Sequence, residues 1–188
     1  RNVDFSADGR ELYYSSERNG HWAVYKTSLV RKEDKLFTYA TDFKEQRVSP
    51  EGQTCFQMDV STDGKREAYY KDRTSLVIQS TDSDKTKVLF EGVNYSYSDG
   101  DQSFEWSPDS HYILCNWQKD GGWNNQDVAM VDSAGGGITN LTRSGYSDGN
   151  FRWALGGKAM TWESDKNGYR SHGSWGSEGD IYVMFFDT

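Results

Sequence analysis

The stretch Phe5-Ser6-Ala7-Asp8-Gly9 returns three more times along the chain, each time as a large apolar residue followed by a tight turn. The other copies are Val60-Ser61-Thr62-Asp63-Gly64, Trp106-Ser107-Pro108-Asp109-Ser110 and Trp153-Ala154-Leu155-Gly156-Gly157. Aligned on their second residues, the copies are 55, 46 and 47 residues apart. Asp and Gly suit such turns because a carboxylate accepts local backbone N–H groups and Gly tolerates positive φ. A repeat of roughly 40–50 residues is typical of propeller blades or helical arrays.

Strand-like segments surround each turn, which excludes the helical arrays. An apolar run follows every turn, and a third strand follows after a loop. The second strands are expected at 11–14, 68–70, 112–115 and 159–162, and the third strands at 22–25, 76–78, 128–131 and 181–184. A fourth strand is expected near 35–40, 87–90 and 137–141. The unit of four short antiparallel strands predicts an all-β chain built of β-propeller blades.

We expect one propeller region over residues 1–188, with blades at about 1–41, 54–90, 101–142 and 149–188. The fourth blade lacks an outer strand, and the first begins almost at its inner strand. Four blades can close a ring, but this is the lower limit of the architecture. Because exposed strand edges are a liability, we favour part of a larger propeller, joined to further domains of the same polypeptide.

Composition narrows the classes of partner. The 188 residues carry a net charge of -8, whereas a nucleic-acid-binding domain is expected to be basic. No apolar run is long enough for a transmembrane helix, so we expect neither nucleic acid nor membrane insertion. Cys55 and Cys115 lie in apolar strand-like runs, where two buried free thiols are favoured over a disulfide.

The aligned repeats are similar to TolB-like propellers. The first repeat, Phe5-Ser-Ala-Asp-Gly followed by Leu-Tyr-Tyr-Ser-Ser-Glu-Arg-Asn-Gly and Ala-Val-Tyr, carries the resemblance, together with Trp106-Ser-Pro-Asp and Asp180-Ile-Tyr-Val-Met. In that family an Asp usually precedes the inner strand, and Asp99 and Asp148 occupy this place. The second repeat departs most, because Val60 replaces the aromatic residue and the loop around 71–74 is nearly absent.

The last repeat, which runs from Thr161-Trp-Glu-Ser-Asp to Gly-Asp-Ile-Tyr182, resembles the propeller region of bacterial tricorn-like serine proteases. The resemblance implies a periplasmic or secreted protein whose propeller admits or binds peptide, while the catalytic residues lie in later domains. Nothing in this sequence matches those later domains. We therefore expect that this chain has no enzyme activity of its own and binds no cofactor.

Candidate binding residues follow from the expected loops. Loops between second and third strands share one face of a propeller with the connections between blades. Trp123, Tyr169, Arg170, His172 and Trp175 fall in these loops, and aromatic and Arg side chains are common binding anchors. The alternative is that they only cover the propeller and pack on each other.

Two acidic turns, 97–101 and 146–150, recur 49 residues apart and place Asp99 and Asp148 just before inner strands. Their carboxylates could approach the channel mouth and bind a cation, a peptide amine or an Arg side chain. The alternative is an Asx turn that fixes entry into the strand. We expect no metal site, because no loop has EF-hand spacing.

The segment 171–177, Ser-His-Gly-Ser-Trp-Gly-Ser, lacks the Gly-x-Ser-x-Gly pattern of a nucleophile elbow. We therefore expect no catalytic residue. The sequence predicts a non-catalytic substrate-binding or substrate-gating propeller with a peptide or protein partner. One alternative is a TolB-like periplasmic protein-interaction module, and another is a propeller hydrolase with a site at the channel mouth.

Overall fold

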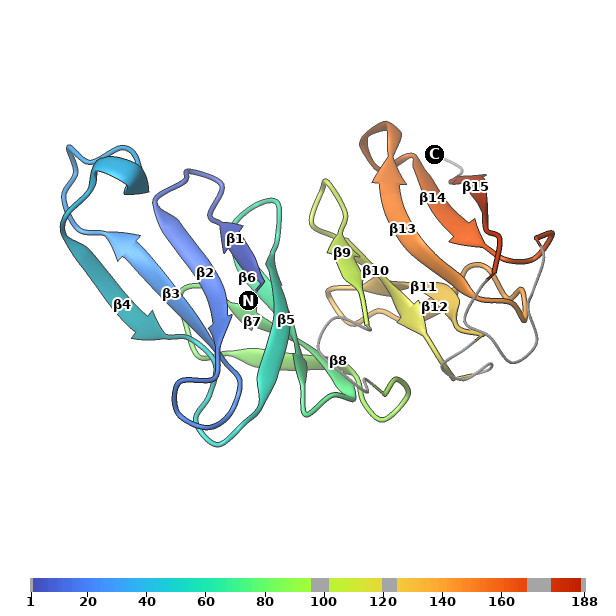
Figure 1. Ribbon diagram of the computed structural model, residues 1–188, viewed down its shortest axis with the longest axis horizontal. Coiled ribbons are helices and arrows are strands. Elements are labelled where there is room, and N and C mark those ends of the chain that lie inside the picture. Colours follow the sequence, from blue (N-terminus) through green and yellow to red (C-terminus); the bar gives the residue numbers. More distant parts are fainter. Residues whose placement is uncertain (1, 96–101, 120–124, 169–176, 187–188) are drawn as a thin grey trace. The chain divides into compact units, whose positions relative to one another are not determined.

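The computed structural model describes residues 2–95, 102–119, 125–168 and 177–186. In these residues the strands form separate antiparallel sheets, each a simple meander in which neighbours along the chain pair with each other (Figure 1). The prediction of an all-β propeller chain is confirmed. No helix in the described ranges is long and apolar enough to span a membrane.

The first two sheets have four strands each. The first comprises β1 (Val3–Phe5), β2 (Glu11–Ser16), β3 (Ala23–Leu29) and β4 (Phe43–Arg47). The second comprises β5 (Cys55–Val60), β6 (Arg66–Lys71), β7 (Ser75–Ser80) and β8 (Thr86–Phe90). A three-residue loop joins β6 to β7, which agrees with the short loop expected in the second repeat.

The third sheet also has four strands, whereas the fourth has three. The third comprises β9 (Phe104–Trp106), β10 (Tyr112–Trp117), β11 (Asp127–Asp132) and β12 (Ile138–Asn140). The fourth comprises β13 (Asp148–Ala154), β14 (Ala159–Ser164) and β15 (Asp180–Phe185). The expectation that the last blade lacks an outer strand is therefore met within the described residues.

The outer strand of the first blade lies later than the sequence predicted. The segment near 35–40 contains a short 3-10 helix, Phe37–Tyr39, and β4 follows at Phe43–Arg47. The ring of Phe37 lies 5.7 Å from the ring of Phe5 and 5.7 Å from that of Phe43. Phe37 thus belongs to an aromatic cluster with Phe5 and Phe43 and not to a strand. The prediction of a fourth strand near 35–40 was therefore wrong.

The chain divides into two compact units, each holding two blades. The first unit contains β1 to β8 and the second contains β9 to β15. In the first unit, Tyr13 and Val24 of one blade pack with Met58, Tyr69 and Val77 of the next. These apolar side chains fill the layer between the two stacked sheets.

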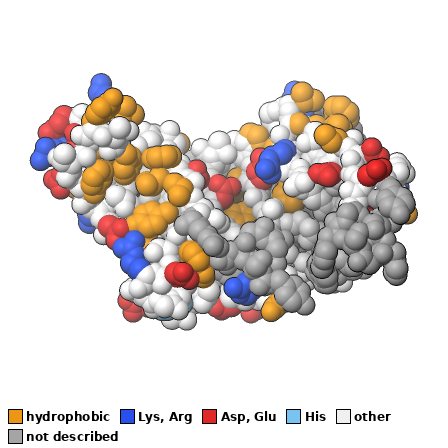
Figure 2. Space-filling view, viewed as in Figure 1, with side chains coloured by type: hydrophobic (Ala, Val, Ile, Leu, Met, Phe, Trp, Pro, Cys, Tyr) orange, Lys and Arg blue, Asp and Glu red, His pale blue; other side chains and the backbone are white. Residues whose placement is uncertain are grey.

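The core of the second unit is built in the same way. Leu114 and Val128 of the third blade pack with Phe151 and Met160 of the fourth. Burial of such side chains is the main favourable contribution to folding. Figure 2 shows hydrophobic side chains also on the outside of the first blade, where Phe5 is 50% and Phe43 44% exposed.

Candidate functional site

The candidate site lies at one end of the fourth blade. Asp148 begins β13 and pairs with Ser164 at the end of β14, which pairs with Asp180 at the start of β15. The turn through Gly156 and Gly157 lies at the opposite end of the same sheet. The long segment between β14 and β15 therefore begins and ends beside Asp148.

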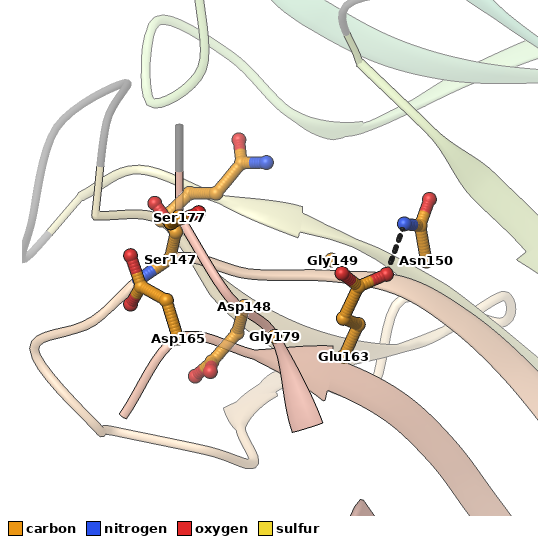
Figure 3. A pocket seen from close by; sticks show the side chains of 9 residues that line it. Ser147, Asp148, Gly149, Asn150, Glu163, Asp165, Ser177 and Gly179 are labelled. Atoms are coloured by element: carbon orange, nitrogen blue, oxygen red, sulfur yellow. Dashed lines mark hydrogen bonds between the residues drawn. The ribbon is translucent and has the colours of Figure 1, made fainter. Parts of the chain in front are cut away.

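A pocket of about 170 Å³ opens at this end of the sheet (Figure 3). Its lining combines carboxylate, amide and hydroxyl side chains with two glycines. The lining residues are Gln126, Ser147, Asp148, Gly149, Asn150, Glu163, Asp165, Ser177 and Gly179. Three of these side chains are carboxylic acids, and none of the lining side chains is basic. The pocket is thus suited to a positively charged or hydrogen-bond-donating group.

Asp148 is the one predicted site residue whose structure is described. Its side chain is only 1% exposed, and its Oδ2 accepts a hydrogen bond from the Ser144 hydroxyl at 2.6 Å. Its Oδ1 is buried without a hydrogen-bond partner among the described residues. Its backbone N–H donates to the carbonyl of Gln126 at 2.9 Å. The Ser144 hydrogen bond ties Asp148 to the linker before β13, and a role of this residue in binding stays a prediction.

Asp127 continues this network toward the third blade. Its Oδ1 accepts the backbone N–H of Ser144 at 2.9 Å, and its Oδ2 accepts the side-chain amide of Asn140 at 2.7 Å. The segment between β12 and β13 is thereby tied to β11 at one side and to Asp148 at the other. These contacts keep the floor of the pocket in a fixed position.

A bulge in β13 places a further polar group in the pocket. The register between β13 and β14 shifts between Gly149 and Arg152, and Asn150 has φ 48°. Bulges redirect side chains, and Asn tolerates this left-handed conformation. The Asn150 amide nitrogen consequently donates to Glu163 Oε2 at 2.7 Å, as Figure 3 shows.

The two remaining carboxylates differ in exposure. Asp165 is 5% exposed and accepts the backbone N–H of Ser147 at 3.0 Å, whereas Glu163 is exposed. Glu163 therefore has its carboxylate at the mouth, where a ligand can reach it. Neither residue was predicted from the sequence, although both stand in the segment Thr161-Trp-Glu-Ser-Asp. Only the pairing of β14 with β13 shows that they lie beside Asp148.

The other predicted site residues lie outside the described part of the chain. They are Trp123, Tyr169, Arg170, His172, Trp175 and Asp99. Four of them belong to the segment between β14 and β15, whose described ends contribute Asp165, Ser177 and Gly179 to the pocket. Their role in binding stays a prediction.

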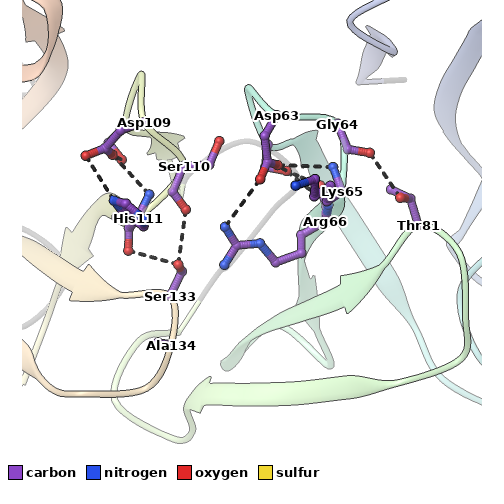
Figure 4. A network of polar contacts seen from close by, with 12 residues as sticks. Asp63, Gly64, Lys65, Arg66, Thr81, Asp109, Ser110, His111, Ser133 and Ala134 are labelled. Atoms are coloured by element: carbon purple, nitrogen blue, oxygen red, sulfur yellow. Dashed lines mark hydrogen bonds and ion pairs between the residues drawn. The ribbon is translucent and has the colours of Figure 1, made fainter.

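The opposite ends of the sheets carry the repeated turns, and Figure 4 shows two of them. In one, the Ser107 hydroxyl donates to Asp109 Oδ1 at 2.5 Å and accepts the N–H of Tyr112 at 2.9 Å. In the other, Ser61 makes the same bonds to Asp63 and Arg66 at 2.7 and 3.0 Å. These side chains satisfy one another locally, so the turns hold neighbouring strands together.

Hydrogen bonding within these turns sets the charge of their aspartates. The Ser107 hydroxyl and the backbone N–H of His111 hold the pKa of Asp109 below its usual value. The Ser6 hydroxyl and the N–H of Arg10 lower the pKa of Asp8 in the same way. Both carboxylates are therefore ionised at neutral pH and serve as hydrogen-bond acceptors within the turn.

Among the described residues, neither the possible metal ligands nor the two cysteines form a reactive site. Within them, no group of three His, Cys, Asp or Glu side chains is placed to hold a metal ion. Cys55 and Cys115 are free and buried, as the sequence favoured. Burial raises the pKa of the Cys55 thiol to about 12 and that of the Cys115 thiol further, so both are poor nucleophiles.

Comparison with known proteins supports the fold. No family model and no curated protein matches the chain. Among solved structures, the tricorn protease aligns with a TM-score of 0.69 and 13% identity, covering 97% of this chain and 17% of that one. TolB from Acinetobacter baumannii aligns with a TM-score of 0.64 and 17% identity, covering 98% and 40%. The β-propeller domain of the trilobed protease from Pyrococcus furiosus gives 0.53 and 14%, covering 98% and 54%.

The chain thus spans less than two thirds of each of these proteins. At such low identity the likeness concerns the fold and not the activity. Together with four antiparallel meanders at the repeat spacing, it shows that this chain has a TolB-like β-propeller fold.

Proposed function

We propose that this chain is a non-catalytic binding module, the substrate-binding or substrate-gating propeller of a tricorn-like protease. The observation that carries the proposal is the acidic pocket beside Asp148, into which an Arg or Lys side chain of a peptide, or its amino terminus, would fit. A ligand cation placed there would meet Glu163 at the mouth. The net charge of -8 would favour approach of a basic peptide at low ionic strength.

The proposal includes a periplasmic or secreted location and a peptide as the partner. Both are what the resemblance of the last repeat to tricorn-like protease propellers implies. The structural likeness to a tricorn protease and to a trilobed protease propeller supports the protease context. The likeness to a TolB protein keeps the alternative of a protein-interaction module, which would bind a folded partner rather than an extended peptide. The hydrolase alternative would require turnover by this chain alone.

A charge-neutralising change tests the pocket. Titration calorimetry compares a hexapeptide of alternating Ala and Arg with its Ala and Gln counterpart, for the original chain and for Glu163→Gln. We expect binding of the Arg peptide only, weakened about three- to tenfold by Glu163→Gln, since one partly exposed ion pair is worth about 1 kcal/mol. The affinity should also fall as salt rises from low to physiological concentration.

The matched control is Glu17→Gln, which removes an exposed carboxylate from the first unit and should leave binding unchanged. Equal binding of both peptides, or equal loss in both variants, would show that this pocket is not the binding site. Hydrolysis of either peptide by the chain would instead support the hydrolase alternative.

A further inference from the structure

Glu67 occupies a position in β6 where other blades have apolar residues. It is six residues after the turn residue Ser61, and the equivalent positions in the third and fourth blades are Ile113 and Met160, both 0% exposed. Glu67 is itself 0% exposed. It pairs across the sheet with Val60 on one side and is opposite Gln79 on the other. A carboxyl group therefore stands in the packing layer between the first two blades.

Neither oxygen of this carboxyl has a hydrogen-bond partner within the described residues. The amide of Gln79 is already used, because it donates to the carbonyl of Val48 at 3.0 Å and accepts the Tyr69 hydroxyl at 3.1 Å. An unpaired carboxylate in such a place carries a large desolvation penalty, so the neutral acid is the stable form.

The charged groups that face Glu67 from the first blade are engaged with each other. Lys26 on β3 donates to Glu11 Oε1 at 2.9 Å, and Tyr13 on β2 donates to Glu11 Oε2 at 2.8 Å. Other titratable groups also surround this layer. They are Tyr69 on β6 itself, Cys55, Asp4, which accepts the N–H of Val60 at 3.0 Å, and Asp82, whose charge acts on Tyr13. Lys26 is the cation whose charge acts on Glu67, and Glu11 holds it.

We propose that Glu67 makes the contact between the first and second blades sensitive to pH, closed while the carboxyl is neutral and loosened when it ionises. The proton released on ionisation passes to solvent. The new charge can be stabilised only if Lys26 leaves Glu11 or if water enters between the sheets. Either rearrangement disturbs the packing of Tyr13 and Val24 on the second blade.

The direction of the effect follows from proton linkage. Burial raises the pKa of Glu67 to about 8, with Lys26 opposing the shift and Glu11 adding to it. The folded state therefore binds this proton more tightly than the unfolded chain does. The stabilisation is complete below the pKa of an unfolded Glu, about 4.3, and is lost as pH rises through about 8.

The test compares the full chain with Glu67→Gln, an uncharged side chain of the same shape, between pH 5 and pH 9. In the original chain we expect the unfolding equilibrium constant, measured in urea, to rise roughly 500- to 1,000-fold over this range, since the pKa is about 8 in the folded state and about 4.3 in the unfolded chain. Amide hydrogen exchange, corrected for its intrinsic pH dependence, should show loss of protection in β2 and β6. Glu67→Gln should remove most of both changes, whereas Glu51→Gln, at an exposed position, should keep them.

Carbon-13 NMR of the Glu67 carboxyl in the original chain provides a second measurement that does not depend on a variant folding. A titration midpoint well above the range of exposed glutamates supports the proposal. A midpoint between pH 4 and 5 would overturn it, as would a Glu67→Gln variant whose stability and exchange follow pH as the original chain does.

Discussion

At the scale of single residues, a serine hydroxyl organises three of the four repeated turns. Ser6, Ser61 and Ser107 each donate to the Asp two residues later and accept the N–H five residues later. The fourth turn has Ala154 in this place and has positive φ at three successive residues, 155 to 157, whereas each of the other turns has it at one, namely Gly9, Gly64 or Ser110. Two kinds of turn, one with a serine hydroxyl at its start and one without, therefore connect the first and second strands of the blades.

Ser107→Ala tests the hydroxyl. The change removes two hydrogen bonds, one of them to a carboxylate, and should lower the free energy of unfolding by about 1–3 kcal/mol at pH 7. Because the Ser107 hydroxyl lowers the pKa of Asp109, this contribution is present above the pKa of an unfolded Asp and is lost as pH falls through the folded pKa. The penalty, measured by urea unfolding, should therefore shrink in acid.

Ser83→Ala is the control for this change, since Ser83 is exposed and accepts only one long bond, from the N–H of Lys85 at 3.5 Å. A loss below 0.5 kcal/mol is expected there. Similar losses for the two variants would show that the turn hydroxyl has no special role.

At the scale of elements, two of the inner strands, β5 and β13, contain a bulge at the same position of the repeat. Asn2, Gln57 and Asn150 each stand four residues before the turn residue of their blade, and all three have positive φ. In β5 and β13 the strand register shifts at this place. In the fourth blade the bulge orients Asn150 toward Glu163, so a feature of the strand shapes the pocket.

The fourth sheet buries one phenylalanine against the third and exposes another, and the two make the contribution of this packing measurable. Phe151 in β13 is 1% exposed and packs with Leu114 and Met160, whereas Phe185 in β15 is 70% exposed. Phe151→Ala should cost about 3–5 kcal/mol, because it leaves a cavity between two sheets. Phe185→Ala should cost less than 1 kcal/mol. Chemical denaturation of both variants checks the difference, and equal losses would contradict the packing described.

At the scale of the whole molecule, the two compact units each bury one of the chain's two cysteines. Cys55 lies in the first unit and Cys115 in the second, both 0% exposed. Each thiol therefore reports the opening of its own unit. The native protein should react very slowly with a thiol reagent at pH 8, since burial raises the pKa of both thiols.

Phe151→Ala should speed the labelling of Cys115 far more than that of Cys55, because the cavity lies in the second unit. Mass spectrometry of peptides after timed labelling in mild denaturant separates the two sites. Equal acceleration at both cysteines would show that the two units open together as one cooperative body.

The sequence by itself determined the fold class and most of the strand positions. Turn chemistry and short apolar runs are local properties, so together with the repeat spacing they were enough to predict four meanders and their turns. The prediction failed at Phe37, where an aromatic contact with Phe5 and Phe43 outweighs strand propensity. The contact with Phe5 joins residues distant in the sequence and leaves no periodic signal.

The site depended on tertiary structure. Asp148 was found from its place before an inner strand, but its burial follows from the bonds with Ser144 and Gln126, which the strand pairing brings together. Glu163 and Asp165 join it only because β14 lies beside β13. Nothing in the sequence singles out Glu67, which stands just before the expected strand 68–70. Only the stacking of two sheets removes it from water, and this burial, a property of neighbours distant in the chain, changes its chemistry.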